Sequence, residues 1–184
     1  MTCSRTLRRS VRLLSAFRSW QSDPDRFYCA IAADAVCVIG SRIAIKGSLA
    51  LDIGGGAGYF TESLRAAGAR CYVADPDIGE LSGRGERPEG AVIGDGYALP
   101  FRTGTADLVV CSNVLEHVAR PYDLVDEMAR ITRPGGHLWV CFTNWYSPWG
   151  GHETSPWHYL GAKRAEDRFL RRNGALPKNR LGTT

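Results

Sequence analysis

The stretch L-D-I-G-G-G-A-G, from Leu51 to Gly58, carries the strongest structural signal in the sequence. It lies between an apolar run over residues 48–53 and a segment over 59–67 whose apolar residues recur at helical spacing. Its alternating glycines allow a tight turn and close approach of the backbone to a ligand, and the segment that follows offers free N–H groups at its start. The pattern predicts a strand, a glycine-rich loop and a helix.

Strands and helices are expected to alternate beyond this loop. Further strands are predicted over residues 70–74, 91–93, 106–111 and 137–142, with a helix over 122–132. The run over 106–111 is almost continuously apolar, as in a strand that is buried on both faces. We therefore predict a doubly wound α/β fold, in which a mostly parallel sheet of about five strands has helices on both faces.

The length of 184 residues suits a single domain that spans 1–184. Within it we distinguish N-terminal helices over 1–40, a ligand-binding core over 48–142, and an aromatic loop with a basic helix over 143–184.

The net charge of +4 is concentrated at the two ends of the chain. Residues 1–20 carry five arginines and no acid, residues 163–180 carry seven basic and two acidic residues, and the remainder is acidic. A nucleic-acid-binding core needs a basic face on the folded body, so no nucleic-acid partner is expected. The basic ends are compatible with peripheral contact to an anionic membrane surface.

The segment from Thr6 to Trp20 is predicted to form a basic amphipathic helix, followed by a second helix over 24–38. Its apolar residues recur at helical spacing: Leu7, Val11, Leu14 and Phe17. We expect this stripe to pack on the domain, with a helix that lies on a membrane surface as the alternative. No stretch is long and apolar enough to span a membrane, and arginines interrupt the segment where a signal peptide would be apolar.

The six cysteines show no metal-binding spacing. Three of them, Cys71, Cys111 and Cys141, lie in apolar runs, which is typical of buried thiols in a reducing compartment. We therefore expect a cytoplasmic protein.

Acidic residues stand where the predicted strands end. Asp52 precedes the first glycine by two residues, Asp75 follows the second strand and Asp95 follows the third. The carboxyl ends of parallel strands meet at one edge of a sheet, so these side chains should line one ligand site. Asp75 can accept two hydrogen bonds from a ribose diol, Asp95 can accept one from an amine such as that of adenine, and Asp52 suits a cationic ligand.

Two common glycine-rich motifs do not fit the loop. The dinucleotide fingerprint G-x-G-x-x-G requires a small residue where Tyr59 stands, and no Gly-Lys-Ser/Thr follows as in a P-loop. A nicotinamide-dependent oxidoreductase is therefore kept only as an alternative.

The sequence resembles the class I S-adenosylmethionine-dependent methyltransferases over about residues 25–175. The features that carry the resemblance occur in the family's order: LDIGGGAG (51–58), Asp75, GDGYALPF (94–101), ADLVVCSNVLEHV (106–118) and RPGG (133–136). The resemblance implies a Rossmann-like fold, S-adenosylmethionine as the cofactor and methyl transfer as the reaction. The stretch over 142–161 further resembles a group of uncharacterised actinobacterial members.

In that family the glycine loop holds the methionine part of the cofactor. The acid after the second strand binds the ribose, the acid after the third binds the adenine amine, and the segment after the fourth lines the site. The resemblance therefore implies the following cofactor contacts: Asp52, Gly54, Gly56, Gly58, Asp75, Asp95, Gly96, Ser112 and Asn113.

A catalytic base is needed only if the methyl acceptor is a hydroxyl group. His117 follows the fourth predicted strand, and a neutral imidazole is well matched to proton removal near pH 7. The alternative is that His117 braces the helix that follows it. No metal is expected, because the spacing of His152, Glu153 and His158 fits no helical zinc motif.

The loop over 145–159 is rich in aromatic residues, which suit a small-molecule acceptor with an apolar or sugar-like part, or a lipid. The alternative is that these rings pack the loop against the domain.

The sequence departs from the family after its fifth predicted strand. Family members have seven strands and end in an antiparallel hairpin, whereas this sequence ends at Thr184 soon after a helix predicted over 161–173. We therefore expect the hairpin to be missing and the edge of the fifth strand to be unpaired. A homodimer could use the open edges, and a truncated, non-catalytic cofactor-binding fragment is the alternative function.

Overall fold

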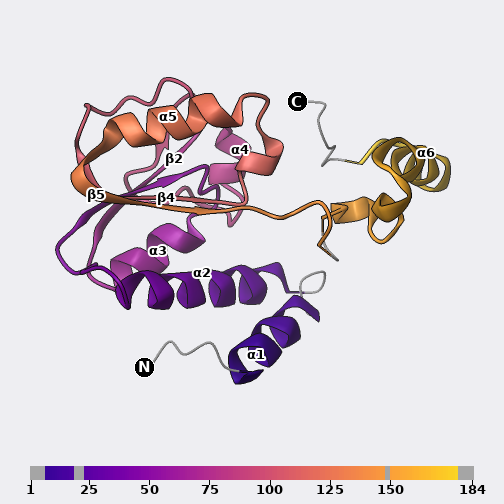
Figure 1. Cartoon of the computed structure of the whole chain (residues 1–184), viewed down its shortest axis with the longest axis horizontal. Coiled ribbons are helices and arrows are strands. Elements are labelled where there is room, and N and C mark those ends of the chain that lie inside the picture. The colour runs from indigo at the N-terminus through magenta and orange to yellow at the C-terminus, as the bar shows by residue number, and fades with distance from the viewer. Residues whose placement is uncertain (1–6, 19–22, 148–149, 178–184) are drawn as a thin grey trace.

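A computed structural model describes residues 7–18, 23–147 and 150–177 of the chain. Its centre is one parallel sheet with the strand order β3-β2-β1-β4-β5 (Figure 1). The strands are β1 (Leu49–Ile53), β2 (Arg70–Asp75), β3 (Val92–Ile93), β4 (Ala106–Ser112) and β5 (Thr132–Cys141). The predicted doubly wound α/β fold with five strands is confirmed.

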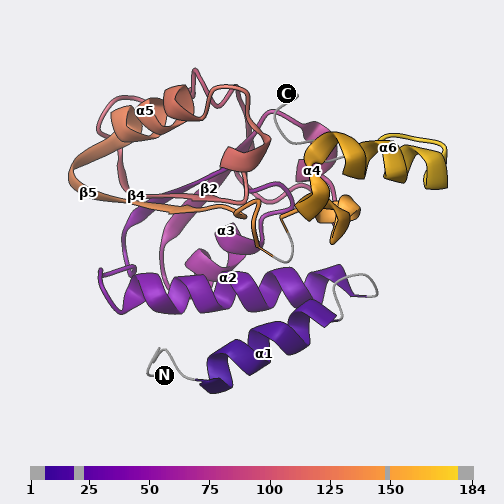
Figure 2. The ribbon, with the colours of Figure 1, turned by 45° about the vertical axis from the view of Figure 1, so that its right-hand side comes forward.

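Helices cover both faces of the sheet (Figures 1 and 2). One face carries α2 (Pro24–Gly40) and α3 (Tyr59–Ala66), with α1 (Leu7–Arg18) packed outside α2, and the other face carries α5 (Pro121–Ile131). The remaining elements follow the strands: α4 (Ile78–Leu81), the 3₁₀ turns η1 (Leu115–His117), η2 (His152–Thr154) and η3 (Trp157–Leu160), and α6 (Ala162–Asn173). Neither α4 nor the three 3₁₀ turns were predicted from the sequence.

The side chains of the central strand β4 are buried on both faces of the sheet. Leu108 and Val110 pack into the apolar cluster beneath α2 and α3, whereas Val109 and Cys111 pack into the cluster beneath α5. Successive side chains of a strand point to opposite faces, so a continuous apolar run fills both clusters at once. These two clusters fix the position of the strand ends that form the site.

The outer strand β5 is covered much less well. In the described part of the chain it pairs only with β4, and its Leu138 and Val140 are 40% and 39% exposed. The helix that follows it, α6, lies beyond the carboxyl ends of the strands and not on the sheet (Figures 1 and 2). Cys141 at the end of β5 is exposed, so its predicted burial is wrong, whereas Cys71 and Cys111 are buried.

Two arginines of the first helix pair with a carboxylate on α2. The guanidinium group of Arg9 donates to both carboxylate oxygens of Asp34 on α2, and Arg12 donates at 3.0 Å. Hydrogen bonding to Arg9 holds the pKa of Asp34 below its usual value, although burial opposes this shift. Leu7 and Val11 are 82% and 56% exposed, so the prediction that this apolar stripe packs on the domain is wrong for them.

The side chains of Leu14 and Phe17, and the whole of Trp20, lie outside the described residues. Among the helices that the structure describes, none has the length and apolar character needed to cross a bilayer.

Candidate functional site

The candidate site lies where the strand order reverses, at the carboxyl ends of β1 and β4 (Figure 1). Gly54 begins the loop after β1 with φ +69°, and a Cβ atom there would lie 2.5 Å from Cγ2 of Val114 in the loop after β4. Gly58 closes the loop with φ +81°, and its Cβ would lie 2.6 Å from Pro88. Glycine is therefore required at both positions by its backbone conformation and by the close approach of a neighbouring loop.

Asp75 joins the ends of two neighbouring strands. Its Oδ2 accepts a hydrogen bond of 3.1 Å from the backbone N–H of Gly56, and its Oδ1 accepts one of 2.9 Å from Asp77. Burial raises the pKa of this carboxyl group, although the two backbone donors oppose the shift. Each carboxylate oxygen has two lone pairs, so both can accept a second hydrogen bond from a ligand above the loop.

Asp52 lies underneath the same loop. It is 1% exposed, and its Oδ2 accepts hydrogen bonds from the backbone N–H and the hydroxyl of Thr61, at 3.0 and 2.8 Å. A Cβ atom on Gly55 would collide with this carboxylate. Asp52 was predicted to suit a cationic ligand. Because its oxygens are buried, it can attract a cation through its charge but cannot contact it directly.

Desolvation by burial raises the pKa of Asp52 to about 6, while the two Thr61 hydrogen bonds oppose the shift. A buried carboxylate at this depth interacts strongly with nearby charge, because the surrounding dielectric constant is low.

Asp95 and Gly96 follow β3, at the outer side of the site. Asp95 is exposed, and its Oδ1 accepts a hydrogen bond of 2.9 Å from the backbone N–H of Tyr97. The Tyr97 hydroxyl accepts from the backbone of Arg120, whose guanidinium group lies 4.1 Å above the tyrosine ring. The loop that holds Asp95 is thereby anchored to the start of α5.

Two buried polar atoms, one at the end of β4 and one in η1, have no partner among the described residues. Ser112 Oγ and Glu116 Oε2 form no hydrogen bond within the described residues. An unsatisfied buried polar atom costs about 1–3 kcal/mol, so such atoms are candidates for ligand contact. Between them, Asn113 has φ 58°, an uncommon conformation for a residue with a side chain, and its N–H donates to Cys141.

Glu116 was not among the residues selected from sequence. Its Oε1 accepts a hydrogen bond of 2.9 Å from the backbone N–H of Thr143, which ties the loop after β4 to the segment after β5. The only available signal was its place beside His117 in the segment N-V-L-E-H. His117 is half-buried in η1, where its backbone N–H donates to Val114.

Rings of the aromatic loop pack partly on each other. His158 is fully buried, with Nε2 3.2 Å from the carbonyl oxygen of Ser147 and its ring edge-on to Trp145. Packing of the loop, the alternative considered above, therefore accounts for Trp145. Trp149 and the side chain of His152 lie outside the described residues.

Comparisons with known proteins agree on one family. Residues 51–140 match the profile described as a methyltransferase domain. An uncharacterised methyltransferase of Mycolicibacterium gilvum is 44% identical over 97% of this chain and 74% of its own length.

Two solved structures show the same fold. An inferred S-adenosylmethionine-dependent methyltransferase of Methanococcus maripaludis superposes with a TM-score of 0.51 at 19% identity, over 88% of this chain and 72% of that one. An inferred methyltransferase in complex with the Haloferax volcanii activator Trm112 superposes with a TM-score of 0.52 at 23% identity, over 72% of this chain and 58% of that one.

Proposed function

This chain belongs to the methyltransferase family, and we propose that it binds S-adenosylmethionine at the carboxyl ends of β1 to β4 and transfers the methyl group to a small-molecule, sugar or lipid acceptor. The observation that carries the proposal is the position of Asp75. Its carboxylate bridges the loops after β1 and β2, and both oxygens retain lone pairs that suit a ribose diol.

The other residues around the loop fit the same cofactor. Glycine at 54 and 58 lets the loop pack closely against its neighbours, and Asp95 is exposed where an adenine amine would be recognised. Ser112 Oγ is a buried polar atom that a ligand would satisfy. We assign Gly56, Gly96 and Asn113 to the lining of the same site.

The protein contributes mainly alignment and electrostatics to the reaction. When bound, S-adenosylmethionine supplies a methyl group already activated by its positively charged sulfur. Alignment of two reactants can provide about 7–11 kcal/mol, so the loops after β1 and β4 need only hold them in line and exclude water. The ionised Asp52 beneath the loop favours a cation above it.

His117 is the proposed base for a hydroxyl acceptor, since it lies on the loop after β4 beside the glycine loop. In the alternative role it braces the turn η1, through which β4 connects to α5.

Partners other than the acceptor are part of the proposal. The Haloferax volcanii structure is a complex with an activator protein, so a protein partner is a candidate for this chain as well. A homodimer through the open edge of β5 is a second candidate. The exposed Leu7 and Val11 beside the arginines of α1 support peripheral membrane contact as a third.

Calorimetric titration with S-adenosylhomocysteine tests the cofactor site. We expect saturable 1:1 binding, weakened about tenfold or more in Asp75→Asn, which loses a charged acceptor. Asp126→Asn removes the same charge from an exposed position on α5 and should leave the affinity unchanged. Absence of binding by a cooperatively folded chain overturns the proposal, and a nicotinamide titration then tests the oxidoreductase.

Methyl transfer is measured separately. Binding that depends on Asp75 without transfer to any small-molecule, sugar or lipid acceptor would favour a non-catalytic cofactor-binding module over an enzyme.

A further inference from the structure

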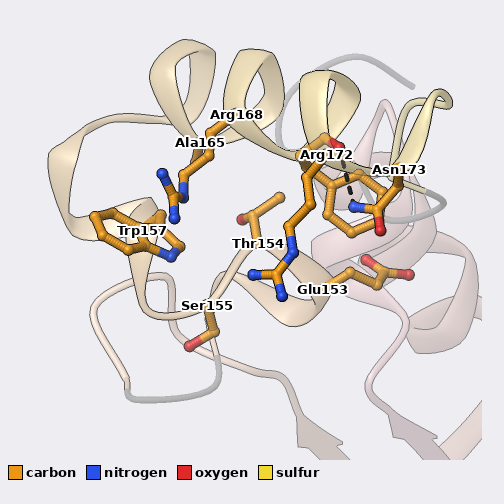
Figure 3. A pocket seen from close by; sticks show the side chains of 9 residues that line it. Glu153, Thr154, Ser155, Trp157, Ala165, Arg168, Arg172 and Asn173 are labelled. Atoms are coloured by element: carbon orange, nitrogen blue, oxygen red, sulfur yellow. Dashed lines mark hydrogen bonds between the residues drawn. The ribbon is translucent and has the colours of Figure 1, made fainter.

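A cleft of about 260 Å³ lies between α6 and the segment over 153–157 (Figure 3). No residue of the glycine loop lines it, and the elements that do, α6 and the 153–157 segment, lie beyond the carboxyl ends of the strands (Figure 1). We propose that this cleft binds an anionic group, a phosphate or a carboxylate, carried by a small molecule or by a lipid headgroup.

Arg168 is held in place by an aromatic ring. Its guanidinium carbon lies 3.8 Å from the ring centroid of Trp157, close enough for a cation–π interaction. Stacking uses the flat face of the guanidinium group and leaves the N–H donors at its edge. Because these donors are fixed before a ligand arrives, less side-chain freedom is lost when an anion binds.

Arg172 lies one helical turn after Arg168, so both side chains occupy the same face of α6. Both extend from the helix toward the 153–157 segment (Figure 3). Neither forms an ion pair with a carboxylate in the part of the chain that the structure describes. Two like charges one turn apart repel, and an anion between them would remove that cost.

Most of the other residues that line the cleft are uncharged, so Arg168 and Arg172 dominate its charge. The hydroxyl of Thr154 donates to the backbone carbonyl of Gly151, and the Asn173 side chain donates to Phe169. Among the described residues that line the cleft, Glu153 is the one acid; its carboxylate points toward Asn173 and away from the guanidinium of Arg172 (Figure 3).

The chemistry of this cleft favours an oxyanion over a neutral ligand. Guanidinium groups bind phosphates and carboxylates through paired N–H donors, and such charge-assisted hydrogen bonds are stronger than those between neutral groups. The exposed part of Trp157 adds an apolar surface beside the anion, so a phosphate attached to a flat apolar group should bind more tightly than inorganic phosphate.

Binding is tested on the full chain with three probes: inorganic phosphate, phenyl phosphate, and phosphatidylcholine vesicles with or without phosphatidic acid. The variants are Arg168→Gln and Arg172→Gln. Lys163→Gln is the matched control, because it removes one positive charge from α6 at a residue that does not line the cleft. Thermal unfolding of each variant verifies that these exposed substitutions leave the fold intact.

We expect phenyl phosphate to bind saturably, with Kd raised about tenfold in each arginine variant and nearly unchanged in Lys163→Gln. Binding only to vesicles that contain phosphatidic acid, with the same dependence on both arginines, identifies a headgroup as the source of the anion. No binding to any probe, or an equal loss in Lys163→Gln, overturns the proposal. Titration with S-adenosylhomocysteine is independent of these outcomes and reports on the cofactor site alone.

Discussion

The carboxylate of Asp52, at the end of β1, accepts both the backbone N–H and the side-chain hydroxyl of Thr61, in the first turn of α3. This pair of hydrogen bonds spans the glycine loop from below and fixes the distance between the strand end and the helix start. The loop is thereby shaped from underneath. The buried carboxylate has a cost that depends on pH.

Asp52→Asn should become more stable relative to the native chain as pH rises. The amide oxygen can still accept both Thr61 donors, but the side chain no longer titrates. Burial raises the pKa of Asp52 to about 6 from 3.8, so between these values the folded state binds more protons than the unfolded state. This group therefore makes the native chain lose stability from about pH 4 to about pH 6, by on the order of 2–3 kcal/mol.

Urea unfolding over a series of pH values measures this difference. The quantity compared is how the difference in free energy of unfolding between Asp52→Asn and the native chain changes with pH. Any cost of the substitution that does not depend on pH therefore cancels. Asp126→Asn controls for the loss of one negative charge. Parallel curves for Asp52→Asn and the native chain would show that the carboxyl group is not perturbed.

Gly54→Ala should destabilise the chain more than Gly135→Ala. Both residues have positive φ, +69° and +75°, so both substitutions carry the same backbone strain, about 1 kcal/mol. A Cβ at Gly135 meets no atom within 4 Å, whereas one at Gly54 meets Val114 at 2.5 Å and forces the two loops apart. We expect a further 1–3 kcal/mol from this overpacking.

Thermal unfolding and titration with S-adenosylhomocysteine check both parts of this prediction. Gly54→Ala should also weaken binding, because the loops that it separates line the proposed cofactor site. Equal losses of stability in the two alanine variants would mean that Val114 moves aside without cost.

The positions of the strands along the chain and of the acids at their ends could be predicted from sequence because both are local patterns. An apolar run followed by Asp75 predicts a strand end in a parallel sheet, whatever lies around it. The role of Asp52 could not be predicted in this way, since its partner Thr61 belongs to the next helix. The pattern indicated that the Asp52 carboxylate faces a ligand. In the structure this carboxylate is buried beneath the glycine loop, where it accepts hydrogen bonds from Thr61.

Other differences arise from tertiary packing. The last strand was predicted over residues 137–142, but β5 begins already at Thr132, with an irregular register between its pairings to Ala106 and Leu108. The partner strand β4 extends this pairing, which no local propensity indicates. Likewise, the helical spacing in α1 does not reveal which of its faces meets α2.

His117→Ala should separate cofactor binding from proton removal. If His117 is the base for a hydroxyl acceptor, turnover falls on the order of 10²-fold or more while affinity for S-adenosylhomocysteine is retained. His117→Gln restores a polar group that can brace η1 but cannot act as the base, so it should be as slow as the alanine variant. Recovery of turnover in His117→Gln would assign a bracing role, and unchanged turnover in His117→Ala would exclude the base.

Asp34→Asn should weaken the attachment of α1 to the domain without unfolding the core. Asp34 is buried against Arg9 and Arg12, and none of the α1 side chains that the structure describes belongs to the two main apolar clusters. Pairing with Arg9 lowers the pKa of Asp34 in the folded state. The contribution of this carboxylate to the attachment of α1 is therefore fully present above its unfolded pKa of about 4, and it is lost as pH falls through the lower folded pKa. The arginines are partly exposed, so we expect an effect of only about 1 kcal/mol.

An effect of this size corresponds to a several-fold rise in the rate at which trypsin cleaves α1, with little change in the midpoint of global unfolding. Under acid conditions the native chain should show the same rise in α1 opening, which hydrogen exchange of the α1 amides measures. Asp126→Asn again serves as the control, since it removes an acid that is not engaged by α1. If cleavage in Asp34→Asn matches the native rate, contacts other than the Asp34 pair hold α1, and the basic face of the helix is not what attaches it.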